Sequence, residues 1–195
     1  KGKPIILSTG IASLEDIDLA LKTIRKHGVT EIALLKCTSS YPAPIEEANL
    51  NMIQDLSKRF NVVPGLSDHT LGIMAPIVAT SLGAKIIEKH FILDCSIEGP
   101  DASFSLDEKE FTEMVNAVRL TEKLMGEINY DLTDKQKRGR EFSRSLYITK
   151  DVLKGDVITE ENVRSIRPGF GMHPKYLNNV LGLKFSKDFS IGSRL

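Results

Sequence analysis

Residues 62–91 have the sequence VVPGLSDHTLGIMAPIVATSLGAKIIEKHF, and this stretch decides the fold. It begins with a short apolar run at 62–66 and ends with a second one at 84–91. The residues between them, from about 71 to 82, have the apolar content of a helix that stops at Gly83. A strand, a helix and a second strand with short connections predict parallel strands joined by a right-handed crossover.

The same alternation extends along the chain on both sides of this stretch. Apolar strands are expected at 4–8 and 32–37, and amphipathic helices at 13–28, 45–60 and 107–125. Four strand–helix units predict an α/β fold with a parallel sheet, either open or closed into a (β/α)8 TIM barrel. Four units are half of such a barrel, and alone they leave apolar strand edges unpaired. We therefore expect residues 1–125 to be half of a barrel domain whose other half lies outside this chain.

The pattern changes after residue 125. Residues 126–141 are polar, and we interpret them as a linker. Residues 142–195 are short segments separated by glycine and proline, with strand-like runs at 145–148 and 156–158, a single helical turn at 160–163 and a turn at 177–181. This arrangement is typical of a small, compact, β-rich domain.

Composition excludes several classes of function. Lysine and arginine together number 26, as do aspartate and glutamate, and this balance argues against nucleic-acid binding through phosphates. The basic cluster at 135–144 is interpreted as part of the solvated linker. No apolar run approaches the ~20 residues that cross a membrane, so we expect no membrane association. Two lone cysteines, Cys37 and Cys95, indicate a reducing compartment, and the cytoplasm is the expected location.

Two histidines follow neighbouring strands of the expected sheet. His69 follows residues 62–66, and His90 lies at the end of the next strand. Because side chains alternate along a strand, Glu88 and His90 share one face and Ile87 the other, which suits the helix layer. Adjacent strands lie about 4.8 Å apart, so both imidazoles could share one ion such as Mn²⁺, Fe²⁺ or Zn²⁺. The alternative is that each histidine hydrogen-bonds a neighbour in a polar pocket.

Four short sequence motifs resemble those of a known enzyme family, which the spacing of the two histidines alone could not indicate. The segments KCTSSYP at 36–42, GLSDHTLG at 65–72, IEKHF at 87–91 and GPD at 99–101 occur in this order. They resemble the barrel of the sialic-acid synthase family, of which this chain would be the C-terminal half-barrel. KDVLKG at 150–155 and RPG at 167–169 resemble the family's antifreeze-like (SAF) domain. SSYPAP at 39–44 and SFS at 103–105 are most similar to the pseudaminic acid synthases.

The resemblance implies a role for each matching residue. His69 and His90 match the ligands of a divalent metal, Mn²⁺ in the first place, with Mg²⁺, Co²⁺ or Fe²⁺ as alternatives. Glu88 is the candidate acid/base group, and the candidate substrate-binding residues are Ser8, Ser39, Tyr41, Ser67, Asp101 and Arg167. Ordinary structural alternatives remain open: helix capping for Ser8 and Ser67, loop packing for Tyr41, turn formation for Asp101 and a plain surface position for Arg167. We interpret Cys37 as a packing residue, because the strand pattern places no histidine near it.

The implied reaction is a metal-dependent condensation of phosphoenolpyruvate with an open-chain N-acetylated amino sugar. Its products would be phosphate and a nine-carbon nonulosonic acid, pseudaminic acid by preference and a sialic or legionaminic acid otherwise. The family further implies a domain-swapped homodimer, in which Arg167 reaches the partner's barrel mouth, and an inactive isolated fragment. The alternatives are a different phosphoenolpyruvate-dependent barrel enzyme and a non-catalytic SAF-type binding module.

Overall fold

The computed structural model describes residues 2–94 and 96–195, so Cys95 lies outside the described residues. The chain divides into two compact units, with the boundary between Glu127 and Ile128. Across the described ranges, no helix has the length and apolar content needed to cross a membrane.

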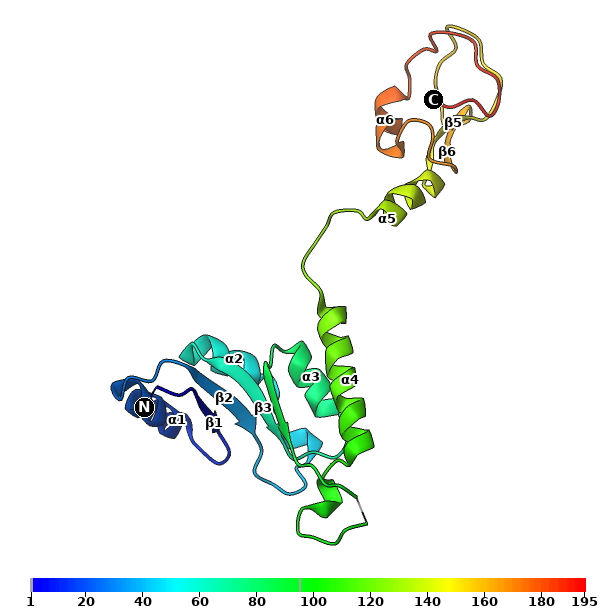
Figure 1. Cartoon of the computed structure of the whole chain (residues 1–195). Coiled ribbons are helices and arrows are strands. Elements are labelled where there is room, and N and C mark those ends of the chain that lie inside the picture. Colours follow the sequence, from blue (N-terminus) through cyan, green and yellow to red (C-terminus); the bar gives the residue numbers. More distant parts are fainter. Residues whose placement is uncertain (1, 95) are drawn as a thin grey trace. The chain divides into compact units, whose positions relative to one another are not determined.

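The first unit alternates strands and helices. Its strands are β1 (Ile5–Ser8), β2 (Ile32–Cys37), β3 (Val63–Asp68) and β4 (Ile86–Lys89). Its helices are α1 (Leu14–Lys26), α2 (Met52–Phe60), α3 (Met74–Ser81) and α4 (Glu108–Met125). The strands are all parallel and lie in the order β1-β2-β3-β4 (Figure 1). The sheet is curled as half of a (β/α)8 barrel, which confirms the predicted fold class.

One side of the sheet packs against the helices. Leu34 of β2 lies in a buried cluster with Leu21 of α1 and Leu56 of α2. Leu66 of β3 lies in a second cluster, with Ile53 of α2. Because side chains alternate, the residues that precede and follow Leu34 and Leu66 point to the concave side, the interior of a closed barrel.

Register brings the polar ends of the strands together. In the β3–β4 ladder Ser67 is the partner of Glu88, and Asp68 is the partner of Lys89. Partners in a parallel ladder point to the same side, so the first pair lies on the concave side and the second on the helix side. The carboxyl ends of these strands therefore present two different polar pairs on opposite faces.

Helix α1 begins with a capping box formed by Ser13 and Asp16. Ser13 Oγ accepts a hydrogen bond from the Asp16 backbone N–H at 3.2 Å, and Asp16 Oδ2 accepts bonds from Ser13 Oγ at 2.7 Å and Ser13 N at 2.9 Å. The bond from the Ser13 hydroxyl, followed by the bond from the Ser13 backbone N–H, lowers the pKa of the Asp16 carboxyl.

We expect Asp16→Asn to remove a pH-dependent part of the stability. Because the folded-state pKa of Asp16 is lowered, its contribution is fully present above the ordinary value of 3.8 and is lost as pH falls through the lowered value. Urea unfolding at pH 7 and at pH 3 measures this, and the gap between parent and variant should shrink at pH 3. Glu15→Gln, in the same helical turn, is the control. An equal gap at both pH values would contradict the assignment.

Two of the predicted helices begin later than expected. The range 45–60 is not one helix: a 3₁₀ turn at Ile45–Glu47 precedes α2, which begins at Met52. Asn49 separates them with a left-handed φ of 46°, a conformation that asparagine tolerates better than most residues. Gly72, with φ of 72°, likewise delays the start of α3 to Met74. The fourth strand is also shorter than predicted, so His90 lies just beyond β4.

The second unit contains a small antiparallel sheet. Strand β5 (Ser145–Ile148) pairs with β6 (Val163–Ile166) around a core that includes Leu146 and Phe185. The expected strand at 156–158 is absent from the described structure, which has only an isolated bridge between Val157 and Lys184. The helical turn predicted at 160–163 is instead a hydrogen-bonded turn at 160–162, because Val163 begins β6.

The range interpreted as a linker contains a helix, α5 (Asp134–Gly139), followed by a 3₁₀ turn at Arg140–Phe142. Thr133 and Gln136 form a capping box that starts α5. The turn predicted at 177–181 is helix α6 (Leu177–Val180), which follows a 3₁₀ turn at Pro174–Tyr176.

Candidate functional site

A serine and a glutamate form a hydrogen-bonded pair on the concave side of the sheet. Ser67 Oγ donates to Glu88 Oε1 at 2.6 Å across the β3–β4 ladder. Ser67 is buried, whereas Glu88 is exposed on the open side. The structure contradicts helix capping by Ser67, because Ile73 occupies the N-cap of α3 and makes no side-chain cap. Ser67 instead donates to Glu88 Oε1, and this hydrogen bond does not involve Glu88 Oε2.

The two histidines meet beyond the ends of the same strands. Their ring centroids lie 5.2 Å apart in an edge-on arrangement. His69 Nδ1 lies 3.0 Å from the Thr38 carbonyl oxygen, which can only accept a hydrogen bond, so Nδ1 carries the proton. In the neutral ring the lone pair is then on Nε2, as in metal-binding histidines whose other nitrogen donates to a backbone carbonyl.

The loop after β4 returns to cover His90. The Leu106 backbone N–H donates to the His90 carbonyl oxygen at 3.0 Å, and that of Ile92 donates to the Leu106 carbonyl oxygen at 2.9 Å. This return places Asp101 Oδ2 3.6 Å from His90 Nδ1. Asp101 also shapes the turn through its backbone, since its carbonyl oxygen accepts from Ser105 Oγ at 2.7 Å. Turn formation and proximity to His90 are therefore both observed for Asp101.

Two aromatic rings lie against the histidine pair. Tyr41 lies against His69, with ring centroids 4.3 Å apart, and 6.2 Å from the ring of His90. Phe104, which is 3% exposed, lies 4.9 Å from His90 and 5.7 Å from Tyr41. Sequence reasoning did not select Phe104 as a site residue. Its aromatic character in the loop beside Asp101 was the available signal, but only the return of the loop brings it to the histidines.

The remaining predicted site residues of this unit lie on neighbouring strand ends. Ser8 ends β1 and is exposed, and it does not cap α1, whose N-cap is Ser13. Ser39 Oγ would lie 3.1 Å from a Cβ added at Gly10, so Ser39 borders the loop that follows β1. Cys37 Sγ lies 3.7 Å from Ser39 Oγ.

Cys37 has a histidine neighbour, contrary to the sequence interpretation. Its sulfur lies 4.0 Å from His69 Nδ1. The strand pattern could not show this, because the contact arises where the chain after β3 folds over Thr38. Cys37 is nevertheless buried at 6% exposure, which agrees with packing.

A buried lysine supports the Thr38 turn that receives His69. Lys36 Nζ donates to the Cys37 carbonyl oxygen at 2.8 Å and to Thr38 Oγ1 at 2.9 Å. Burial lowers the pKa of the Lys36 ammonium, and the nearby Cys37 opposes that effect. These bonds fix the turn whose carbonyl oxygen accepts from His69.

The donor set fits a divalent ion. With its Nδ1 directed at the Thr38 carbonyl oxygen, the neutral form of His69 has its lone pair on Nε2, and His90 lies across from it with its Nδ1 towards a carboxylate. Two imidazoles leave most positions of a six-coordinate ion for water and substrate oxygens. Across residues 2–94 and 96–195, no group of three or more His, Cys, Asp or Glu side chains is arranged as a metal site.

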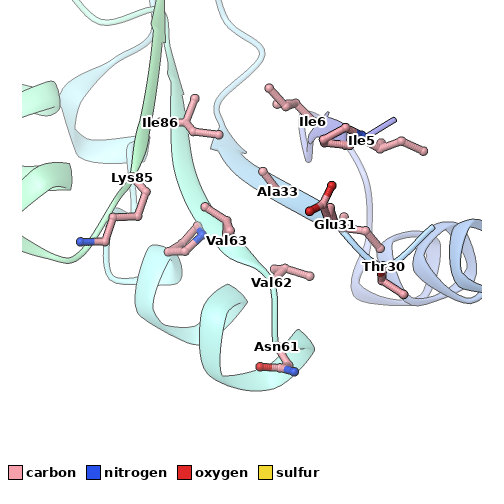
Figure 2. Close-up of a pocket in the computed structure, with 13 residues that line it drawn as sticks. Ile5, Ile6, Thr30, Glu31, Ala33, Asn61, Val62, Val63, Lys85 and Ile86 are labelled. Carbon is pink, nitrogen blue, oxygen red and sulfur yellow. The ribbon is translucent and has the colours of Figure 1, made fainter. Parts of the chain in front are cut away.

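The histidine pair and the Ser67–Glu88 pair border a small hollow lined by polar residues. It has a volume of about 270 Å³ and is lined by residues 67–69 and 88–90. A larger hollow of about 630 Å³ lies at the opposite, amino ends of the strands, where Figure 2 shows mostly apolar side chains such as Ile6, Val63 and Ile86. Active sites of (β/α)8 barrels lie at the carboxyl ends of the strands, so the smaller hollow is the candidate site.

Arg167 belongs to the second unit and is exposed. The loop that carries it is held from beneath: Ser145 Oγ donates to the Pro168 carbonyl oxygen at 2.7 Å and accepts from the Gly171 backbone N–H at 2.9 Å. Ser145 itself is 1% exposed. Arg167 is therefore a surface residue on a loop that is anchored to the buried Ser145 by two hydrogen bonds.

Two family models match the chain. The model described as the NeuB family matches residues 1–130, and the model described as the SAF domain matches residues 143–194. The first covers the half-barrel with its histidine pair, and the second covers the small antiparallel unit.

Named relatives match over nearly the whole chain. A pseudaminic acid synthase of Campylobacter jejuni is 49% identical over 99% of this chain, and an N,N'-diacetyllegionaminic acid synthase of Legionella pneumophila is 36% identical over all of it. The chain spans 56% of the length of each of these two relatives. A solved N-acetylneuraminic acid synthetase from Leptospira borgpetersenii, in complex with citrate, is 34% identical with a TM-score of 0.65, over 71% of this chain and 48% of that one.

Proposed function

This chain belongs to the NeuB family, and from that premise we propose that it forms part of an enzyme that condenses phosphoenolpyruvate with an amino sugar. The observation that carries the proposal is the meeting of two facing imidazoles and a Ser67–Glu88 pair at one end of the half-barrel. The relatives are named as pseudaminic, legionaminic and sialic acid synthases, which supports this reaction type. We propose that the activity belongs to a complete barrel, because the chain spans about half of those relatives.

His69 and His90 would hold a divalent ion, Mn²⁺ in the first place. When bound, such an ion supplies Lewis-acid polarisation of a substrate carbonyl oxygen. His69 is prepared for this role by the Thr38 carbonyl oxygen, which keeps the ring proton on Nδ1. Asp101 and Phe104 both lie against the ring of His90 and would restrict its orientation.

The reaction joins C3 of phosphoenolpyruvate to the aldehyde carbon of an open-chain N-acetylated amino sugar. Positive charge develops at C2, water adds there, and phosphate leaves with the bridging oxygen. Glu88, one of whose carboxylate oxygens is held by Ser67, would be the acid/base group. It would give a proton to the aldehyde oxygen, which becomes a hydroxyl, and regain one from the water that adds at C2. Ser8, Ser39, Ser67 and Tyr41 would orient the two substrates, and the site contributes mainly alignment and charge stabilisation.

Pseudaminic acid is the product we favour, because the C. jejuni pseudaminic acid synthase shares more identity with the chain than the legionaminic acid synthase does. A legionaminic or sialic acid is the alternative. Arg167 would close the barrel mouth of a second subunit in a dimer, and its firmly held loop suits such a role.

The metal requirement has a direct test in the protein that carries the complete barrel. We expect phosphate release from phosphoenolpyruvate and the amino sugar to stop after EDTA treatment and gel filtration, and to return with Mn²⁺. Phosphate release and metal content are measured on the same samples. Undiminished turnover by protein shown to be metal-free would refute the metal role. The condensation reaction would then be tested separately, by identifying its product.

A further inference from the structure

A fully buried ion pair lies beneath the histidines on the helix side of the sheet. Lys89 Nζ is 2.6 Å from Asp68 Oδ2, and the two side chains are 0% and 1% exposed. Asp68 immediately precedes His69, and Lys89 immediately precedes His90. The two residues are also register partners in the β3–β4 ladder. One pair of charges is therefore adjacent in sequence to both candidate ligands.

The pair also fixes the backbone around His69. Lys89 Nζ donates a second hydrogen bond, to the Thr70 carbonyl oxygen at 2.6 Å. Asp68 Oδ1 accepts from the Thr70 backbone N–H at 2.9 Å. The residue after His69 is thus held through both its N–H and its carbonyl, and the residue before it is held through its carboxylate.

Removing two charges from water is costly. The penalty is on the order of several kcal/mol for each ion, and well-packed apolar residues of similar volume usually serve stability as well or better. Asp68 and Lys89 both border the hollow of about 270 Å³, but their side chains are only 1% and 0% exposed, so a substrate in the hollow would not reach their charged groups. Stability and substrate binding therefore both fail to explain why charges occupy these two positions.

We propose that Asp68 and Lys89 are a positioning pair that sets the separation and orientation of the His69 and His90 imidazoles. The inference rests on the proposed metal role of these histidines. Through Thr70 the pair fixes the turn that carries His69, and through the ladder it fixes the end of β4 from which His90 extends. Neither residue touches the ion or the substrate, so their effect is transmitted through the two histidines.

The test is the neutral double variant Asp68→Asn/Lys89→Met in the protein that carries the complete barrel. Asn and Met keep the approximate shapes, and Asn keeps an acceptor for the Thr70 N–H. The double variant avoids the lone buried charge that would endanger folding of either single variant. The matched control is Asp55→Asn/Arg59→Met, which neutralises a surface pair on α2.

We expect the double variant to melt within a few degrees of the parent and to bind Mn²⁺ about 10- to 100-fold more weakly, the usual effect of losing outer-shell support. The control should bind Mn²⁺ as the parent does. A folded double variant with parental Mn²⁺ affinity would overturn the proposal.

A metal-free readout separates this inference from the metal role itself. The ¹H–¹³C resonances of the His69 and His90 rings, recorded without metal, should shift in the double variant and stay in place in the control. If the parent fails to bind Mn²⁺, the metal role is wrong and these resonances still decide the positioning role. Unchanged resonances of both rings would overturn it.

Discussion

His69→Ala and His90→Ala are each expected to lower kcat by at least about 100-fold in the protein with the complete barrel, since loss of outer-shell support alone costs 10- to 100-fold. Either change removes one of the two imidazoles whose rings face each other at 5.2 Å. The remaining ring would hold a divalent ion weakly. Steady-state phosphate release and Mn²⁺ titration measure the two effects, and both should fall together.

His27→Ala is the matched control. His27 is the C-cap residue of α1 and precedes the amino end of β2, whereas His69 and His90 lie at the carboxyl ends of the strands. It should leave turnover and metal affinity at the parental level. Retention of metal-dependent turnover by both His69→Ala and His90→Ala would remove the pair from the site.

Gly65→Ala is expected to destabilise the half-barrel by at least about 2 kcal/mol, as overpacking of a closed core does. A Cβ at Gly65 would collide with Leu35 Cδ2 and would lie 2.7 Å from the Ile86 backbone oxygen. The backbone oxygen cannot move aside without displacing β4 from β3. Because Ser67 and Glu88 lie two residues further along these strands, activity should fall as well. Urea unfolding measures the change in free energy.

Gly99→Ala serves as the control for this substitution. An added Cβ at Gly99 meets no atom within 4 Å, so its effect on the free energy of unfolding should be below about 0.5 kcal/mol. Parental stability of Gly65→Ala would show that β3 and β4 tolerate separation, which would contradict the close approach of Gly65 to Ile86.

The alternation of strands and helices was predictable because each strand contains a compact apolar run and the stretches between the strands have the apolar patterns of helices. Period-two alternation also predicted correctly that Ile87 packs against the helix layer. Helix starts were less predictable. Asn49 and Gly72 adopt left-handed conformations that shorten two helices, and a polar segment conceals the capping box of α5.

The candidate site was predictable where it follows strand ends and unpredictable where loops return. His69 and His90 are brought together by neighbouring strands, so their approach followed from strand order. Phe104 reaches His90 only because Leu106 hydrogen-bonds beside it. The contact between Cys37 and His69 likewise depends on the turn at Thr38, which no periodic pattern encodes.

Isotope labelling of the reaction tests the proposed function most directly. Phosphoenolpyruvate carrying ¹⁸O at the bridging C–O–P oxygen is incubated with Mn²⁺, the N-acetylated amino sugar and the protein that carries the complete barrel. Mass spectrometry should find a nine-carbon keto sugar acid without the label and phosphate with it, because the C–O bond breaks. Unlabelled phosphate with the label retained in the organic product, or the absence of any nine-carbon acid, would contradict the proposed condensation.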